Sequence, residues 1–136
     1  MSRRGASALE FALLLPVFLV LVGGMVDYAW YMQQRALVVR AVREGVRVGA
    51  ITPLAADPAT TATSRSVQVL TDLEFDATTA NVTAAYDDLR AGLTCNTVDT
   101  ITVQAIVPFI RLIGVVPTPA AITVQMTMML EDGNCA

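Results

Sequence analysis

The feature that most limits how this chain can fold is an uncharged apolar run at residues 11–26, close to the N-terminus. As a helix, the run is about 24 Å long, which is short against a hydrocarbon core of roughly 30 Å. Such a run is either the core of a secretory signal peptide or part of a membrane helix that needs additional residues. Because the chain has only 136 residues, the remainder is enough for one small domain.

The residues after the run favour a membrane helix over a cleaved secretory signal. No A-x-A cleavage site follows the run, and Tyr28, Trp30 and Tyr31 come directly after it, as in an interfacial aromatic belt. Nor does the context after Arg3-Arg4 match a twin-Arg export signal.

Charge is distributed unevenly along the chain and predicts its orientation. All nine basic residues are Arg, and six of them precede residue 50, whereas nine acids against three Arg follow it. A basic N-terminus before the span and an acidic remainder place the N-terminus in the cytoplasm and the rest outside. We therefore expect a cytoplasmic leader at residues 1–5, a transmembrane helix at 6–32 and an exported α+β domain at 33–136.

Glu10 lies at the edge of the apolar run, where a carboxylate costs free energy unless it is hydrated or finds a cation. One reading is that Glu10 marks the cytoplasmic boundary of the span. The other is that the chain is cut after Gly5, so that the apolar stretch becomes residues 6–26, about 31 Å long. The new amino group of Ala6 would then neutralise Glu10 in the same or a neighbouring subunit.

Arg3-Arg4-Gly5, followed by four residues and then Glu10-Phe11, resembles a prepilin peptidase site with Glu10 at the fifth mature position. Residues 3–50 as a whole are similar to the TadE-like pseudopilins of tight-adherence (Flp, type IVc) pilus systems. The resemblance implies cleavage between Gly5 and Ala6 by an inner-membrane aspartyl peptidase and a role as a minor pilin in pilus assembly.

The same resemblance implies partners and a location. The partners are the peptidase, an inner-membrane assembly platform, and other pilins that pack against the N-terminal helix. The location is the bacterial inner membrane, with a periplasmic C-terminus and incorporation into an extracellular pilus as a further expectation. A membrane-tethered periplasmic binding module that never enters a fibre is the alternative.

Within the span, Glu10, Phe11 and Pro16 are the residues we expect to govern packing and register between subunits. Pro16 removes the backbone hydrogen bond to Ala12, so it either kinks the helix or is tolerated as prolines in membrane helices are. Gly23-Gly24 is either a close-packing point or a flexible exit from the membrane.

Helical spacing continues through residues 33–50, with a charged face and an opposite apolar face. Gly45 and Gly49 leave a strip free of side chains, which either receives a neighbouring element or is simply tolerated near a helix end. The charged face is most simply a solvated surface; it comprises Arg40, Arg43, Glu44 and Arg47.

A second helix is predicted at residues 58–73, with Asp57 as its N-cap and Pro58 at its first position. Three strand-like runs follow at 79–86, 100–107 and 122–130, and the last two alternate strongly. The predicted fold class is α+β and pilin-like, with two helices and a small three-stranded antiparallel sheet.

The apolar connection at residues 108–119 is expected to pack beneath the sheet or to serve as an interaction site, and to carry at most one helical turn. If the last two strands form a hairpin, opposed residue numbers sum to about 230. Cys95 then faces Cys135, and the two form either a disulfide or a pair of free thiols.

Several function classes are set aside by composition. The acidic excess after residue 50 is unlike a nucleic-acid binder. His and Lys are absent from the chain, and neither a catalytic motif nor a set of clustered metal ligands is present in the sequence. We expect neither an enzyme nor a protein with a cofactor or metal ion.

Overall fold

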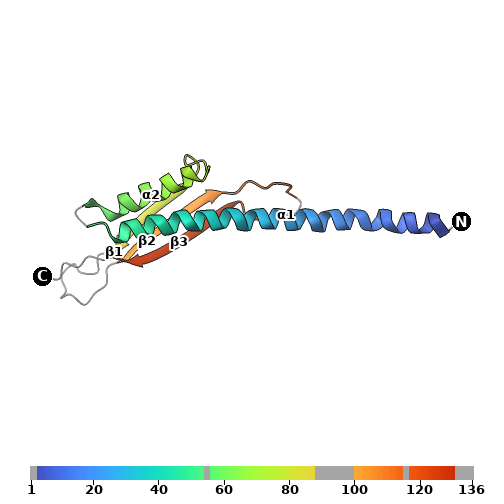
Figure 1. Cartoon of the computed structure of the whole chain (residues 1–136), viewed down its shortest axis with the longest axis horizontal. Helices are drawn as coiled ribbons and strands as arrows, with labels where there is room; N and C mark the ends of the chain where they lie inside the picture. The colour runs from blue at the N-terminus through green and yellow to red at the C-terminus, as the bar shows by residue number, and fades with distance from the viewer. Residues whose placement is uncertain (1–2, 54–55, 88–99, 115–116, 131–136) are drawn as a thin grey trace. The chain divides into compact units, whose positions relative to one another are not determined.

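The computed structural model describes residues 3–53, 56–87, 100–114 and 117–130, with side chains from Glu10 onward (Figure 1). The chain divides into two compact units, Met1–Gln34 with Phe109–Ala120 and Arg35–Pro108 with Ala121–Ala136. The elements are α1 (Arg3–Ala50), α2 (Pro58–Asp72), β1 (Asn81–Asp87), β2 (Thr100–Pro108) and β3 (Ala121–Met129). The expected α+β class, with a long apolar helix, a second helix and an antiparallel sheet, is confirmed.

Helix α1 has 48 residues, about 72 Å of helix, and it continues through Pro16 without a break in its assignment. Its Glu10–Ala50 portion is long and apolar enough to cross a membrane. Only 11% of the most apolar 18-residue segment of this portion is buried. A core helix of a soluble protein would be mostly buried. The exposure of this one therefore indicates a membrane-anchored protein.

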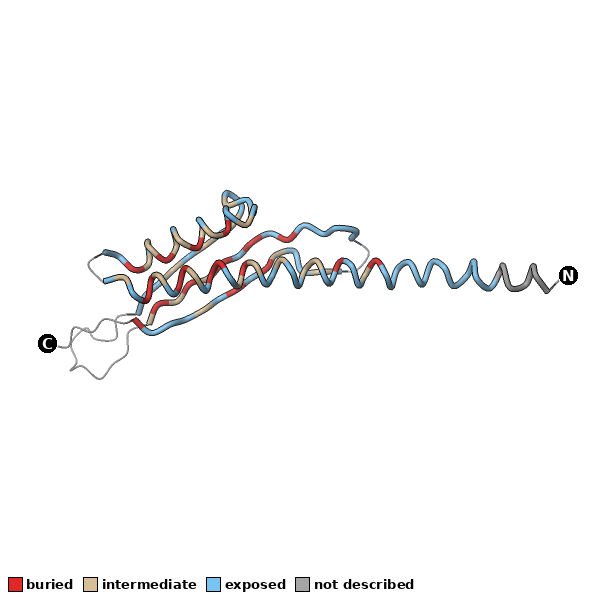
Figure 2. Tube along the Cα trace, in the orientation of Figure 1, coloured by how far each residue is buried: buried red, intermediate tan, exposed pale blue. Residues whose placement is uncertain are grey.

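The C-terminal part of α1 is amphipathic, as its spacing predicts. Arg40, Arg43 and Arg47 are exposed, whereas the apolar side chains on the other side are fully buried in the second unit (Figure 2). The buried positions are Val38, Ala41, Val42 and Val46.

Gly45 and Gly49 lie where α1 approaches neighbouring elements closely. A Cβ atom at Gly45 would lie 2.7 Å from the carbonyl oxygen of Ala62 and would overlap the hydroxyl of Ser66 in α2. One at Gly49 would lie 2.8 Å from the Cβ of Ala62. The close-approach reading of this glycine pair is confirmed.

Helix α2 begins as predicted. Asp57 is its N-cap, Pro58 occupies the first turn, and the Asp57 carboxylate accepts a hydrogen bond from the Thr60 hydroxyl at 2.6 Å. Ala62, Ser66 and Leu70 are fully buried at four-residue spacing, which gives α2 a narrow stripe facing the rest of the unit.

The sheet has the order β1-β2-β3, and both pairings are antiparallel. In the β2–β3 pair, Thr100 lies opposite Met129 and Pro108 opposite Ala121, so opposed numbers sum to 229, one less than the predicted value. One face is buried and apolar, with Ile101, Val103 and Ala105 fully inside. On the other face, the hydroxyls of Thr102 and Thr127 lie 2.8 Å apart on adjacent strands.

The connection after β2 fits the interaction-site alternative better than packing beneath the sheet. Phe109 is buried, but Ile110, Leu112 and Ile113 are 83%, 60% and 53% exposed. Residues 109–114 and 117–120 contain no helical turn. The physical reason is that the backbone of this loop is held by Asp27 of α1, in the first compact unit. Cys95 and Cys135 lie outside the described residues.

Candidate functional site

The expected processing site lies at the start of α1. Gly5 and Ala6 both have helical backbone, and side chains are described only from Glu10 onward. The pairing of the Ala6 amino group with Glu10 therefore stays a prediction. Glu10 itself lies on the exposed surface of the helix, next to Phe11.

Between Phe11 and Val22, α1 presents an apolar surface on every side. Each residue from position 10 to position 22 is exposed, Pro16 included, and successive helical residues point about 100° apart. Phe11, Leu14 and Phe18 are 66%, 66% and 60% exposed. A helix that is apolar all round is stable when lipid or other helices surround it. This stretch, with Glu10 at its edge, is the first part of the candidate site.

Asp27 forms the second part of the site, and the sequence reasoning gave it no role. It is fully buried, and its two carboxylate oxygens accept hydrogen bonds from the backbone N–H groups of Ile113 (2.8 Å) and Gly114 (2.9 Å). Gly114 has φ +79°, a left-handed conformation that glycine adopts without strain. A buried carboxylate is costly unless it is hydrogen-bonded, so this arrangement fixes the loop to the helix.

The neighbours of Asp27 along the helix complete the contact with the loop. Gly23, Asp27 and Tyr31 are spaced by four residues and therefore share one face of α1. Gly23 is buried and lines the same shallow groove as Ile113, which favours the close-packing reading of Gly23-Gly24. Tyr31 packs edge-to-face on Phe109, with ring centroids 5.3 Å apart. This spacing is the sequence signal that could have pointed to Asp27.

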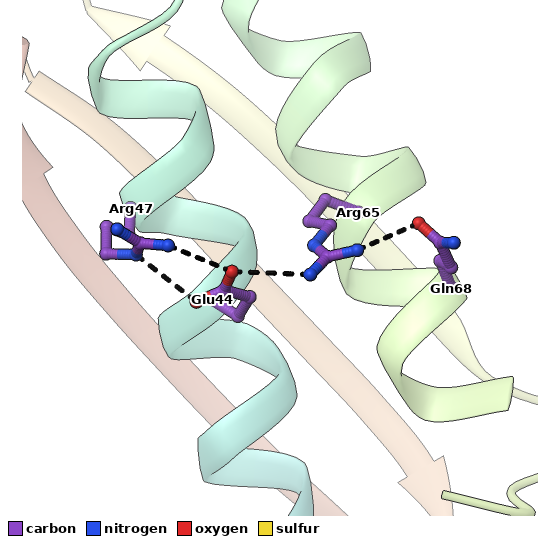
Figure 3. A network of polar contacts seen from close by, with 4 residues as sticks. All are labelled: Glu44, Arg47, Arg65 and Gln68. Atoms are coloured by element: carbon purple, nitrogen blue, oxygen red, sulfur yellow. Dashed lines mark hydrogen bonds and ion pairs between the residues drawn. The ribbon is translucent and has the colours of Figure 1, made fainter. Parts of the chain in front are cut away.

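A polar network in the second unit connects α1 to α2 (Figure 3). The Glu44 carboxylate accepts hydrogen bonds from Arg47 at 3.1 and 3.2 Å and from Arg65 of α2 at 3.4 Å. Arg65 also donates to Gln68 at 3.1 Å. The hydrogen bond from Arg47 holds the pKa of Glu44 below its usual value. The Arg47 side chain is 61% exposed, as expected for a solvated charged face, so the network adds little stability.

Two further carboxylates in the second unit have lowered pKa values for a local reason. The Thr60 hydroxyl and backbone lower the pKa of Asp57, and the Thr78 hydroxyl and backbone lower that of Asp76. Both are turn or cap interactions. Among the residues that the structure describes, no three His, Cys, Asp or Glu side chains are grouped so that they could hold a metal ion.

Comparison with known proteins gives one family. Residues 5–47 match the family described as TadE-like protein, a range that begins at Gly5 and includes Glu10 and Asp27. The resemblance expected from the sequence is thereby confirmed over these residues. Comparison with curated proteins and with solved structures gives no match.

Proposed function

From the match of residues 5–47 to the TadE-like family, we propose that the chain is associated with a Tad pilus system and is a minor pilin or pseudopilin of a type IVc pilus. A prepilin peptidase cleaves it after Gly5, and the mature helix then takes part in pilus assembly. The precursor lies in the bacterial inner membrane, with its N-terminus in the cytoplasm and its second unit in the periplasm.

The observation that supports this proposal is the apolar surface of α1 between Phe11 and Val22, exposed on all sides and bordered by Glu10. Lipid covers such a surface in the precursor, and the helices of other pilins cover it in a fibre. Glu10 is the group that distinguishes assembly from simple anchoring, because a carboxylate at this position gains a partner in the amino group of a neighbouring mature chain. Such a pair sets the axial register of one helix against the next.

Processing is tested with the full chain expressed in its host in the presence and absence of the prepilin peptidase. We expect N-terminal sequencing to give Ala6 for the wild type only when the peptidase is present. Gly5→Val should retain the leader, because a β-branched side chain replaces hydrogen next to the scissile bond. Ser7→Ala, on the other side of the cut, is the matched control and should be processed. An intact Met1 or Ser2 on wild-type protein would refute the proposal.

Assembly is tested separately from processing. Glu10→Ala should be cleaved like the wild type and should lower the yield of sheared pili, because the register pair is lost. Glu10→Asp keeps the charge and should retain part of the yield. If Glu10→Ala is cleaved and the pilus yield is unchanged, the register role is wrong. A chain that is cleaved but absent from every pilus fraction would favour the membrane-tethered binding module.

A further inference from the structure

The loop that follows β2 is bound to α1 through Asp27 and carries large apolar side chains that are exposed. Ile110, Leu112 and Ile113 are 83%, 60% and 53% exposed, with Arg111 between the first two. Three such side chains within four residues form a surface that water solvates poorly. The connection is closed at its base by a hydrogen bond from the Phe109 N–H to the Ala120 carbonyl oxygen at 2.9 Å.

The position of this loop along α1 is fixed by contacts within the first unit. Asp27 binds the Ile113 and Gly114 amides, and Ile113 lines a shallow groove whose other walls are all apolar residues of α1. These residues are Leu19, Val20, Val22, Gly23 and Val26. Leu19 precedes Asp27 by eight residues, about 12 Å along the helix axis. Ile113 therefore lies against the last part of the apolar run, whereas Phe109 packs on Tyr31 just beyond its end.

We propose that residues 109–114 form a membrane-inserted loop whose partner is phospholipid, in the leaflet at the C-terminal end of the α1 span. Ile110, Leu112 and Ile113 enter the acyl-chain region, and Arg111 extends its guanidinium toward the lipid phosphates. Phospholipid is the expected partner because Ile113 shares a groove with apolar residues of the span between Leu19 and Val26. Lipid that surrounds these residues therefore also reaches the side chain of Ile113.

Membrane insertion also accounts for the buried Asp27. In the hydrocarbon region no water is present to bond exposed backbone amides, so non-helical backbone is tolerated only where the protein supplies partners. The amides of Ile113 and Gly114 find theirs in the two carboxylate oxygens of Asp27. A loop in water would need no such acceptor, since water bonds its amides.

The inference rests on α1 being a membrane anchor and is independent of the pilus role. It is tested in the full chain, reconstituted at high dilution in phosphatidylcholine vesicles, with one tryptophan at a time in a Trp30→Phe background. Leu112→Trp reports on the loop, and Phe18→Trp reports on the span. Tyr86→Trp, an exposed position on β1 in the second unit, is the matched control outside the membrane. The quencher is phosphatidylcholine brominated on its acyl chains.

We expect the brominated lipid to remove most of the emission of Leu112→Trp and Phe18→Trp and to leave Tyr86→Trp unchanged. Bromine near the headgroup should quench Leu112→Trp more than bromine near the chain ends. Quenching of Phe18→Trp without quenching of Leu112→Trp would overturn the inference and keep the anchor. Brominated lipid could also fail to quench Leu112→Trp at first and quench it only after the protein is diluted further. That result would show that the loop packs against a second copy of the chain, and it would also overturn the inference. An unquenched Phe18→Trp would instead reject the anchor, and the inference with it.

Discussion

Two acidic residues, Glu10 and Asp27, border the apolar part of α1, and their carboxylates differ in exposure and in hydrogen bonding. Glu10 is exposed at the N-terminal edge, where the proposed pairing would place the amino group of a second molecule. Asp27 is fully buried at the other edge, and backbone amides of its own chain bond both of its oxygens. Glu10 is thus accessible for the proposed assembly contact, whereas Asp27 binds a loop of its own chain.

Asp27→Asn should release one side of the loop. The amide nitrogen of Asn cannot accept a hydrogen bond, so either Ile113 or Gly114 loses its acceptor, at a cost of about 1.5–3 kcal/mol for a bond to a charged group. We expect faster hydrogen exchange at these two amides in detergent micelles, with unchanged exchange in β2 and β3. Tyr28→Phe, at the neighbouring exposed position, is the control. Equal protection of the two amides in wild type and Asp27→Asn would contradict the role given to Asp27.

At the scale of elements, much of the fold could be predicted because its determinants are local. Asp57 and Pro58 start α2 by capping and by a preset φ, and the alternation in β2 and β3 shows in the sequence itself. The role of Asp27 could not be predicted in the same way, because its partner Ile113 is 86 residues away. The apolar character of the 108–119 connection was visible, but it fits burial under a sheet as well as contact with a membrane helix.

Gly45→Ala should destabilise the packing of α1 on α2. The added methyl group would meet the Ala62 carbonyl oxygen at 2.7 Å, and backbone cannot move aside as a flexible side chain does. Overpacking of this kind costs about 1–3 kcal/mol. The measurement is urea unfolding of the full chain in detergent, followed by circular dichroism. Arg43→Ala, at an exposed position of the same helix, should change stability by no more than about 0.5 kcal/mol. Equal midpoints for the two variants would show that the glycine is merely tolerated.

The N-cap of α2 should make stability depend on pH. Because hydrogen bonds from Thr60 lower the pKa of Asp57 in the folded state, the ionised cap stabilises the fold above the unfolded pKa. That contribution is lost as the pH falls through the lower, folded pKa. Asp57→Asn keeps a capping oxygen and tolerates the left-handed φ of 52°, so it should unfold at nearly the wild-type temperature at pH 7. Its melting temperature should then fall less than that of the wild type between pH 5 and strongly acidic conditions. Identical pH profiles for the two proteins would contradict this assignment.

For the whole molecule, the register between β2 and β3 bears on the predicted disulfide between Cys95 and Cys135. Opposed residues of β2 and β3 sum to 229, and the sequence-based hairpin that opposes Cys95 and Cys135 requires 230. The two cysteines lie outside the described residues, so their pairing stays a prediction. A disulfide between them would close a loop of about 41 residues and stabilise the fold by roughly 4 kcal/mol in the chain-entropy model.

The mass of the intact chain, purified from its host without reductant, tests this pairing. A disulfide should lower that mass by two hydrogen atoms relative to the reduced chain, and both thiols should resist alkylation until reductant is added. Cys95→Ser should then unfold at a lower urea concentration than the wild type, and by the same amount as Cys135→Ser, because either change opens the same loop. Two thiols that alkylate fully in the folded, non-reduced chain would rule the disulfide out. The same mass also gives the mature N-terminus, since removal of the first five residues is a far larger difference than the disulfide.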